Sequence, residues 1–298
     1  MGSQSDIERR LSIPGRVSFV AGGGGLQKVR VQTEWSEAEV YLHGAHVTHF
    51  QKKNEPPVLF LSEKSQYKDN TPIRGGVPVI FPWFGPKEAQ PMHGFARLKT
   101  WQLKSVALDA AGRIRLRFKL PDCPEAAGFP AFMAQYTVTV GEALTLNLSV
   151  MNTTNDREFE FETCLHTYFS VGEIGAVSIT GLKGTNYIDK VDNFVKKPET
   201  GEAIHVNGEV NRIYEDTNGP MEITDTKLRR KVRIETEGAT STVVWNPWIE
   251  RAKEMTDFGD EEYLKMVCVE SGNVAKNKIS LSPGKTAALR VKLSTSPI

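Results

Sequence analysis

The sequence predicts an all-β protein, a large antiparallel β-sandwich, and three observations lead to this fold class. Short runs alternate apolar and polar residues, as in RIRLRFKL at 113–120, and such alternation is typical of a strand with one buried and one solvated face. Turn-forming glycine and asparagine residues separate these runs at short intervals. Apolar residues with helical spacing are scarce, and we expect only short helical turns, near 63–68 and 257–265.

The expected strands follow one another along the chain. Residues 16–35 predict a hairpin around the glycine run AGGGG, and residues 38–50 predict a strand with a bulge at Gly44. Residues 131–154 predict a second hairpin. Further strands are expected at 158–169, 176–182, 231–238, 240–246, 263–270 and 286–295. The composition does not change along the chain, and no linker or repeat separates the predicted strands. We therefore expect a single domain.

The composition argues against several classes of protein. Lys plus Arg number 37 and Asp plus Glu number 36, which gives a formal net charge of +1. Such a balance argues against a protein that grips nucleic acid or an anionic membrane, and no run approaches the roughly 18 apolar residues of a membrane span. The N-terminus has no secretory pattern. The cysteines, Cys123, Cys164 and Cys268, are odd in number and widely spaced, so we expect a cytoplasmic protein.

Two predicted strands carry candidate catalytic residues. In 158–169 the alternation places His166 on the polar face of the strand, although position alone favours a hydrogen-bonded structural histidine. In 263–270, Glu270 shares a face with Cys268 and ends an apolar run. A carboxyl group at a strand end backed by apolar residues is partly desolvated, which raises its pKa and makes it a better base. An exposed glutamate at a strand end is the alternative.

Two arginines lie in loops rich in glycine, proline and aromatic residues: Arg74 in TPIRGGVPVIFPWFG and Arg97 in QPMHGFAR. Guanidinium groups bind phosphate through paired hydrogen bonds. Glycines let a backbone approach a ligand closely, and aromatic rings offer stacking faces to a sugar. Asp216 lies in a predicted turn and Trp245 at a predicted strand end. These loops thus carry groups of the kinds that bind phosphate and stack on sugars.

The spacing of His43, His46 and His49 raises the question of a metal site. On a strand, His43 and His49 share a face and His46 does not, so the spacing does not favour a metal ion. We therefore expect neither a metal nor another cofactor.

Six segments in order resemble the glucose-6-phosphate 1-epimerase family, the hexose-6-phosphate mutarotases of the aldose 1-epimerase-like group. They are PIRGGVPVIFPWFG, HGFARLKTW, LHTYF, YEDT, WNPW and MVCVESGN. The resemblance implies a galactose-mutarotase-like supersandwich, as one domain over residues 1–298 in which residues 1–16 are a peripheral segment. It implies that His166 and Glu270 are catalytic. The residues that it implies for substrate binding are Arg74, Gln90, His93, Arg97, Asp216 and Trp245.

The implied reaction exchanges the α and β anomers of a hexose 6-phosphate, most directly glucose 6-phosphate, without a cofactor. Glu270 would take the proton of the C1 hydroxyl while a protonated His166 gives one to the ring oxygen. Asp216 would hold ring hydroxyls, and Arg74 and Arg97 would hold the phosphate. The expected partner is this small molecule, bound by a monomer.

Three alternatives stay open. A mutarotase for unphosphorylated aldoses would share the acid–base pair and lack the phosphate-binding arginines. A non-catalytic carbohydrate-binding β-sandwich would need aromatic residues and no pair of histidine and glutamate. A glycosidase would use two carboxyl groups, where this sequence offers a histidine and a glutamate. The fold class alone does not choose among them.

Overall fold

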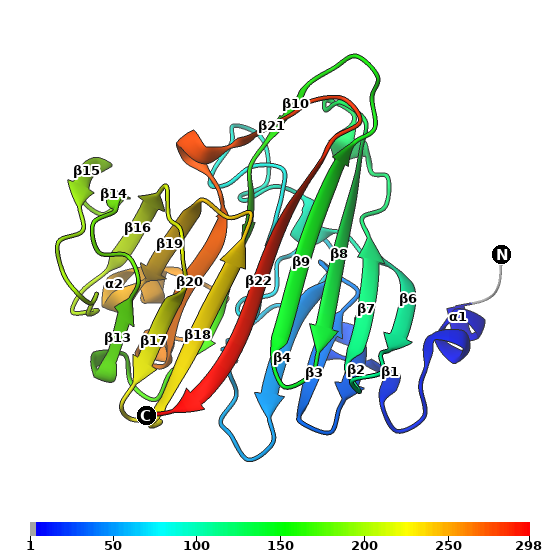
Figure 1. The fold of residues 1–298 in the computed structure, drawn as a ribbon, viewed down its shortest axis with the longest axis horizontal. Coiled ribbons are helices and arrows are strands. Elements are labelled where there is room, and N and C mark those ends of the chain that lie inside the picture. The colour runs from blue at the N-terminus through cyan, green and yellow to red at the C-terminus, as the bar shows by residue number, and fades with distance from the viewer. Residues whose placement is uncertain (1–3) are drawn as a thin grey trace.

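A computed structural model of the chain describes residues 4–298, and most of the molecule consists of antiparallel strands (Figure 1). One of the two eight-stranded sheets is here called the long sheet. Its strands in spatial order are β13 (Val177–Thr180), β17 (Met221–Asp225), β18 (Arg230–Glu237), β22 (Thr286–Pro297), β9 (Leu144–Asn152), β8 (Phe132–Val140), β7 (Ile114–Lys119) and β6 (Gln102–Leu108). The expected all-β fold with antiparallel pairing is confirmed.

Two further sheets and a short ribbon complete the strand structure. The pocket sheet has the order β15 (Val195–Pro198), β14 (Asn186–Asp189), β16 (Val210–Glu215), β19 (Ser241–Asn246), β20 (Met266–Asn273), β11 (Thr163–Leu165) and β5 (Val79–Ile80), and β12 (Tyr168–Ser170) also pairs with β20. The N-terminal sheet has the order β1 (Val17–Ala21), β2 (Gln27–Gln32), β3 (Ser36–Tyr41) and β4 (His46–Lys52). The short ribbon pairs β10 (Phe159–Phe161) with β21 (Ile279–Leu281).

The main core joins one face of the long sheet to both of the other sheets. In β7 the buried residues Ile114, Leu116 and Phe118 alternate with exposed arginines, as the sequence predicts. Each such side chain contributes roughly 1.5–3 kcal/mol when fully buried. The same core cluster includes Val267 and Val269 of β20. Because neighbouring residues of a strand point to opposite faces, Cys268 and Glu270 project from the other face of the pocket sheet.

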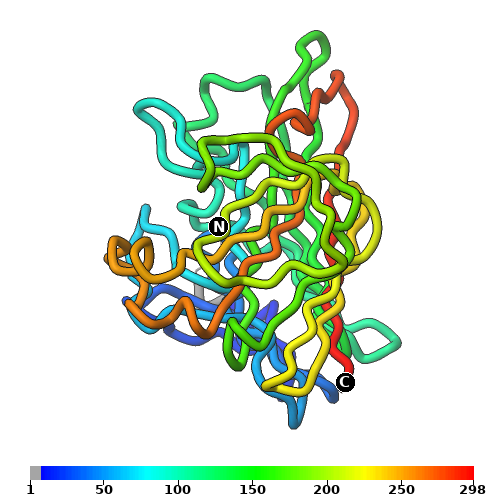
Figure 2. Tube along the Cα trace, turned by 90° about the vertical axis from the view of Figure 1, so that its left-hand side faces the viewer, coloured from blue at the N-terminus to red at the C-terminus, as the bar shows by residue number. Residues whose placement is uncertain are grey.

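The second face of the pocket sheet is covered by loops and one short helix. Figure 2 shows the chain around residues 60–100 and the helix α2 (Trp248–Glu254) on one side of the pocket sheet, with the long sheet on the other. Strands β14 and β16 of the pocket sheet are the neighbours that bring residues near 190 and 211 to the same face. The residues that line the pocket described below come from the pocket sheet and from these covering segments.

The helical elements are short, and none of those in residues 4–298 could cross a bilayer. Besides α2 they comprise the helix α1 (Gln4–Leu11) and the single 3₁₀ turns η1 (Gly23–Gly25), η2 (Ala96–Leu98), η3 (Pro124–Ala126), η4 (Ile174–Ala176), η5 (Glu262–Lys265) and η6 (Ala275–Asn277). The helical turn expected within 257–265 is present as η5. The one expected at 63–68 is wrong, since this segment is irregular. The helices α1 and α2 were not predicted, because each spans too few turns to show helical periodicity.

Two predicted strands are interrupted in the structure. Residues 38–50 do not form one strand with a bulge: Gly44 and Ala45 both have positive φ and form the turn that joins β3 to β4. Residues 158–169 form three short strands rather than one. The break before β12 is a tight turn in which the backbone N–H of Thr167 donates to the carbonyl of Leu165 at 3.0 Å.

Candidate active site

The central feature of the pocket is a contact between His166 and Glu270. Nε2 of the histidine lies 3.1 Å from Oε1 of the glutamate, and the two residues are 7% and 1% exposed. His166 occupies the break between β11 and β12, and its backbone N–H donates to the carbonyl of Pro78 at 3.1 Å. Glu270 lies inside β20, directly opposite Val243 of β19. The expectation that Glu270 ends its strand is therefore wrong, because β20 continues to Asn273.

Burial disfavours charge on both members of this pair. It lowers the pKa of His166 well below its usual value, and the positive charge of nearby groups, Arg97 and Arg74 among them, lowers it further. Burial also raises the pKa of Glu270 well above its usual value, although a hydrogen bond from Cys164 opposes the shift. Both shifts favour the uncharged forms of the two groups, a neutral imidazole and a protonated carboxyl group.

Neighbouring side chains fix the orientation of the pair. The Sγ–H of Cys164 donates to Oε2 of Glu270 at 3.6 Å. The ring of Tyr168 stacks on the imidazole of His166 with centroids 4.8 Å apart, and the indole of Trp245 meets the same imidazole nearly at right angles at 6.2 Å. These contacts leave each catalytic candidate little rotational freedom, which is how a site keeps its reacting groups in place.

The pair lies in a cavity of about 220 Å³. The side chains around it come from the pocket sheet, from the loops before and after β5, and from α2. The lining residues are Arg74, Phe84, Pro86, Met92, His93, Arg97, His166, Tyr168, Lys190, Glu209, Asn211, Val243, Trp245, Arg251, Met255 and Glu270. Cationic side chains outnumber anionic ones in this set, which favours an anionic ligand.

The two arginines expected from the sequence both line the cavity, in different electrostatic states. Arg74 binds Asp257 at 3.1 Å and donates to the hydroxyl of Tyr168 at 3.0 Å. Burial disfavours its charge, but Tyr168 and Asp257 more than offset that effect and raise its pKa. Arg97 is 7% exposed and donates to the carbonyl of Met92 at 2.8 Å. Burial and the charge of Arg74 lower the pKa of Arg97 to about 10.

Lys190 is a further cation of the pocket that the sequence did not reveal. Within residues 4–298 no carboxylate forms an ion pair with its ammonium group, and its Nζ lies 5.9 Å from the centre of the Phe84 ring. Burial lowers the pKa of Lys190, while Glu270 acts in the opposite direction. Its backbone N–H donates to the carbonyl of Asn211 at 2.9 Å. No motif marks this lysine, because its place in the site depends on the pairing of β14 with β16.

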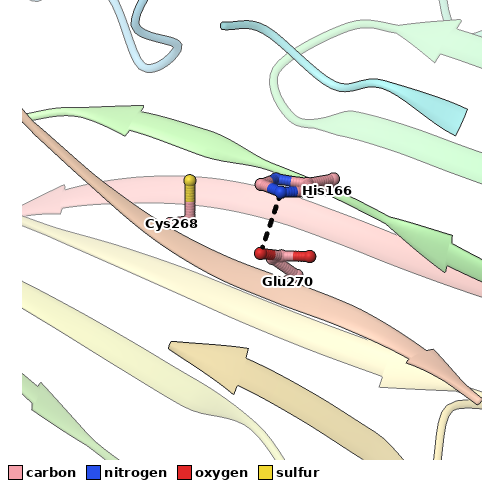
Figure 3. Close-up of side chains that lie close together, drawn as sticks. All are labelled: His166, Cys268 and Glu270. Atoms are coloured by element: carbon pink, nitrogen blue, oxygen red, sulfur yellow. Dashed lines mark ion pairs between the residues drawn. The ribbon is translucent and has the colours of Figure 1, made fainter. Parts of the chain in front are cut away.

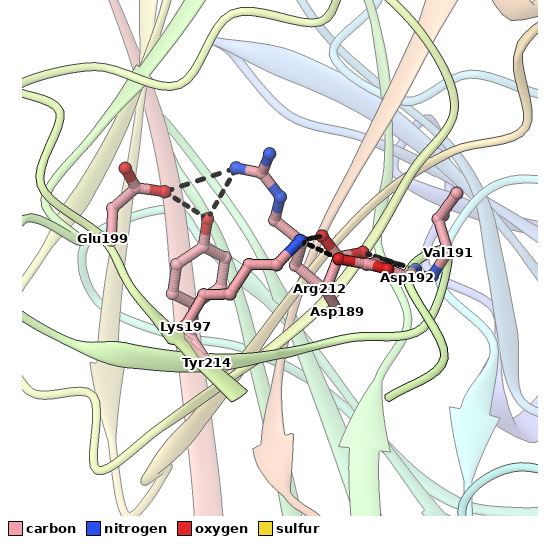
Figure 4. Close-up of polar contacts among 7 residues, drawn as sticks. All are labelled: Asp189, Val191, Asp192, Lys197, Glu199, Arg212 and Tyr214. Atoms are coloured by element: carbon pink, nitrogen blue, oxygen red, sulfur yellow. Dashed lines mark hydrogen bonds and ion pairs between the residues drawn. The ribbon is translucent and has the colours of Figure 1, made fainter. Parts of the chain in front are cut away.

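A polar network next to Lys190 holds the turn that follows it (Figure 4). Oδ1 of Asp189 accepts hydrogen bonds from the backbone N–H groups of Val191 and Asp192 at 3.2 and 3.3 Å. Its Oδ2 accepts from Lys197, which also binds Asp192 at 2.7 Å. In the same view Glu199, Tyr214 and Arg212 form a second group of contacts at the other end of β15. The hairpin β14–β15 is thus fixed at both ends.

His93 also lines the cavity, on a backbone with φ of 65°. The N–H of Gly85 donates to its Nδ1 at 3.0 Å, so the proton of the neutral ring is on Nε2. Burial, with the charge of Arg97 and Lys190, lowers the pKa of His93 to about 2. His93 is therefore a neutral hydrogen-bond donor, and its ring lies 5.6 Å from that of His166.

Two of the residues expected in the site lie outside the cavity. Asp216 is exposed and binds Lys276 at 2.6 Å and Asn277 at 2.9 Å, so the structure does not support the expectation that it holds ring hydroxyls. Gln90 is exposed in the loop before His93 and does not line the cavity. Both residues were expected in the site because they lie in or beside segments that resemble the family. A segment can resemble the family while one of its side chains points away from the site.

The glycine and aromatic residues near Arg74 and Arg97 serve the fold more than the ligand. A Cβ on Gly76 would lie 2.3 Å from the carbonyl oxygen of Val47, and one on Gly94 would lie 2.1 Å from that of Phe81. These glycines thus allow strands and loops of the protein itself to pack closely. The rings of Phe81, Trp83 and Phe95 belong to the main core. Phe84 and Trp245 are aromatic residues that do reach the cavity.

The three histidines of the spacing-three pattern lie elsewhere. His43 and His46 use Nε2–H to donate to the carbonyls of Thr71 and Gly75, at 2.8 and 2.7 Å. His49 lies 3.5 Å from Glu37 on the N-terminal sheet. Burial lowers the pKa of His46 to about 3, although the bond to Gly75 opposes it. His43 and His46 are thus hydrogen-bond donors to the backbone.

The chain is similar to several known proteins. The sequence pattern of the aldose 1-epimerase family matches residues 27–294. Over 272 residues the chain is 35% identical to the "Putative glucose-6-phosphate 1-epimerase" of Cenchrus ciliaris, covering 87% of this chain and 82% of that protein. Over 246 residues it is 35% identical to the protein of the same name from Escherichia coli K12, covering 81% of each. The crystal structure of YeaD from Salmonella typhimurium, named a putative mutarotase, matches with a TM-score of 0.89 and 28% identity over 97% of this chain and 96% of that one.

Proposed function

The chain belongs to the aldose 1-epimerase family, and from this premise we propose that it interconverts the α and β anomers of a hexose 6-phosphate. Glucose 6-phosphate is the substrate that we propose first, because the relatives from Cenchrus ciliaris and Escherichia coli carry that sugar phosphate in their names. The observation that carries the proposal is the contact of His166 with Glu270 inside a cavity with a mainly cationic lining.

The reaction needs one acid and one base within a few ångströms of each other, because the two oxygens that exchange protons are attached to the same carbon. Glu270, as carboxylate, takes the proton from the C1 hydroxyl, and His166, as imidazolium, gives one to the ring oxygen. The bond from C1 to the ring oxygen then breaks and an aldehyde forms. After rotation about C1–C2 the ring closes on the other face, with both proton transfers reversed. Acid–base catalysis of this kind contributes roughly 10²–10⁴-fold.

A single proton held by the pair is sufficient for this cycle. In the proposed cycle a proton passes from Glu270 to His166 across the 3.1 Å contact before the ring opens. The positive charge of Arg97 and Arg74 opposes this transfer, because it disfavours a charged His166. A bound phosphate dianion offsets that positive charge and so favours the imidazolium. In this mechanism the phosphate anchors the substrate and also favours the charged forms of His166 and Glu270 that the reaction needs.

We assign phosphate binding to Arg97, Lys190 and Arg74. Arg97 and Lys190 have no carboxylate partner within residues 4–298, and each approaches Glu270 closely enough to influence its pKa. Arg74 already has Asp257 as a counter-ion. It therefore adds little net charge to the cavity, and its main contribution is to orient the phosphate through hydrogen bonds. The neutral His93 supplies a donor for a hydroxyl or phosphate oxygen. We also propose that the enzyme acts as a monomer.

An unphosphorylated aldose would use the same pair and would leave the cationic lining without a ligand. The direct test of the proposal is exchange NMR spectroscopy of glucose 6-phosphate and of glucose, each with and without the protein. Faster exchange of the phosphorylated sugar supports the proposal. Equal acceleration of both sugars would favour the unphosphorylated substrate, and binding without acceleration would indicate a carbohydrate-binding module.

A further inference from the structure

A third side chain capable of binding a metal ion lies beside the catalytic pair. The ligand atoms of His166, Cys268 and Glu270 are all within 4.8 Å of one another, and all three residues are buried (Figure 3). Among residues 4–298 this is the one group of three or more histidine, cysteine, aspartate and glutamate side chains that meets so closely. Cys268 has no role in the acid–base cycle, and its side chain is buried in a small core cluster with Tyr168 and Met266.

The strands hold these three side chains in a fixed relation. Cys268 and Glu270 are two residues apart in β20 and therefore share a face. Tyr168 pairs with Cys268 in the antiparallel register of β12 with β20, and His166 lies two residues before Tyr168. Figure 3 shows the side chains of Cys268 and Glu270 on the side of β20 where His166 lies. The donors are thus preorganised by backbone pairing rather than by a flexible loop.

We propose that His166, Cys268 and Glu270 form a binding site for Zn²⁺ or a similar thiophilic divalent cation, which blocks anomer exchange when bound. The set of one imidazole nitrogen, one thiolate sulfur and one carboxylate oxygen is a combination that zinc accepts with three protein ligands. His166 and Glu270 line the cavity, and a fourth ligand, water or an anion, would reach the ion from that side. Nε2 of His166 faces Glu270, and Nδ1 is buried without a hydrogen-bond partner among the described residues.

Binding of the cation is a simple exchange for protons. The thiol of Cys268 and the pair formed by His166 and Glu270 release their protons to solvent, and the freed sulfur, nitrogen and oxygen coordinate the ion without any redox change. The same exchange removes the shared proton on which the proposed reaction depends. Inhibition therefore rests on the proposed function, whereas binding of the ion does not.

The charge of the surroundings limits the affinity. Arg74, Arg97 and Lys190 line the same cavity and repel a divalent cation. We therefore expect reversible binding that is weaker than in structural zinc sites. The same cations attract an anion into the open position, so phosphate or chloride completes the coordination more readily than it would in a neutral pocket.

The experiment uses Co²⁺ as a spectroscopic substitute for Zn²⁺, with the full-length protein. The wild type is expected to show the near-ultraviolet band of a cobalt–thiolate bond, and Zn²⁺ is expected to abolish that band and to inhibit exchange of glucose 6-phosphate. Cys268→Ser should lose the band and become on the order of 10–100-fold less sensitive to Zn²⁺. Cys268→Ala serves as a second variant, because it places no new polar group in a buried position.

Two controls distinguish this site from metal binding elsewhere on the protein and from the proposed catalysis. Cys123→Ser removes the partly exposed cysteine and should leave both the band and the inhibition unchanged. Zn²⁺ titration by calorimetry measures binding without any activity, so a protein that binds Zn²⁺ through Cys268 and exchanges no anomers would contradict the proposed function alone. A wild type without a cobalt–thiolate band, or a folded Cys268→Ser or Cys268→Ala protein with unchanged Zn²⁺ affinity, would overturn the proposal of the metal site.

Discussion

Nε2 of His166 contacts Oε1 of Glu270 at 3.1 Å, and this contact joins two strand segments that are more than 100 residues apart in the sequence. Burial pushes the pKa values of the two groups in opposite directions, down for the histidine and up for the glutamate. Both shifts favour the uncharged pair, in which the carboxyl group carries a proton that the imidazole can accept. A pair of this kind can act as acid and base in turn, once a substrate redistributes that proton.

Removal of a phosphate-binding cation is expected to affect glucose 6-phosphate far more than glucose. A charge-assisted hydrogen bond contributes roughly 1.5–3 kcal/mol, so Arg97→Ala and Lys190→Ala should each lower kcat/KM on the order of 10- to 100-fold for the phosphorylated sugar. Part of the loss should appear in kcat, because the phosphate also favours the imidazolium of His166. Arg97→Lys should recover only part of the activity, since lysine keeps the positive charge but cannot form the paired hydrogen bonds of a guanidinium group.

Steady-state kinetics on both sugars check this prediction. Lys276→Ala is a suitable control, because Lys276 is an exposed cation paired with Asp216 outside the cavity. Arg74→Ala is a less clean variant, since it also leaves Asp257 without its partner. Equal losses on both sugars would show that these cations maintain the structure and do not recognise phosphate.

Asp216→Ala is expected to change kcat/KM for glucose 6-phosphate by less than about threefold. The carboxylate of Asp216 contacts Lys276 and Asn277 on the surface, and exposed ion pairs contribute about 0–1 kcal/mol. The sequence segment YEDT had suggested a role in holding ring hydroxyls. A loss of 100-fold or more in the same kinetic assay would restore that role and would require the loop around Asp216 to move when substrate binds.

The stability of the protein is expected to fall below about pH 6.5, the ordinary pKa of histidine. His46 and His93 have pKa values lowered to about 3 and about 2 in the folded protein, mainly by burial. The unfolded chain therefore takes up protons that the folded chain does not, and each such histidine lowers the free energy of unfolding by roughly 1.4 kcal/mol per pH unit until the folded group titrates.

Urea unfolding at several pH values between about 7 and 4.5 checks the effect. His46→Gln keeps a donor near the carbonyl of Gly75 and should reduce the slope of unfolding free energy against pH by roughly 1.4 kcal/mol per unit. His205→Gln, at an exposed position, is the control for replacing a histidine on the surface. If His46→Gln left the slope as in the wild type, His46 would not be the buried neutral group that the structure shows.

Treatment with EDTA is expected to leave the exchange of glucose 6-phosphate undiminished. The acid and the base are protein side chains, so chelation removes nothing that the proposed steps use. EDTA should also restore an enzyme first inhibited by Zn²⁺, which gives a positive control in the same NMR assay. Activity that EDTA abolished and Zn²⁺ restored would refute the metal-free mechanism.

The alternation of single strands was readable from the sequence, whereas the position of the strands against one another was not. RIRLRFKL forms the strand β7 with the predicted buried face, because local alternation and tertiary burial agree there. The turn at Gly44 was misread as a bulge, since a glycine within an apolar run is compatible with either. Helix α2 was missed because its seven residues span too few turns to show helical periodicity.

The residues of the candidate site were likewise predictable from the sequence only in part. His166 and Glu270 could be named from strand faces and family segments, and the structure brings them together. Lys190 could not be named, because only the pairing of β14 with β16 carries it to the cavity. The burial of both faces around His166 was also not predictable, since the loops that cover the pocket sheet come from distant parts of the chain.

The central claim is that His166 and Glu270 exchange protons with the two oxygens at C1, and Glu270→Gln tests it most directly. Glutamine has the same shape and cannot accept the proton, so anomer exchange of glucose 6-phosphate, followed by NMR and corrected for the spontaneous rate, should fall at least about 100-fold. Because the raised pKa of Glu270 makes the folded protein less stable as pH rises, the variant should unfold no more easily than the wild type at neutral pH. A folded Glu270→Gln protein that exchanges anomers within a few-fold of the wild-type rate would contradict the claim.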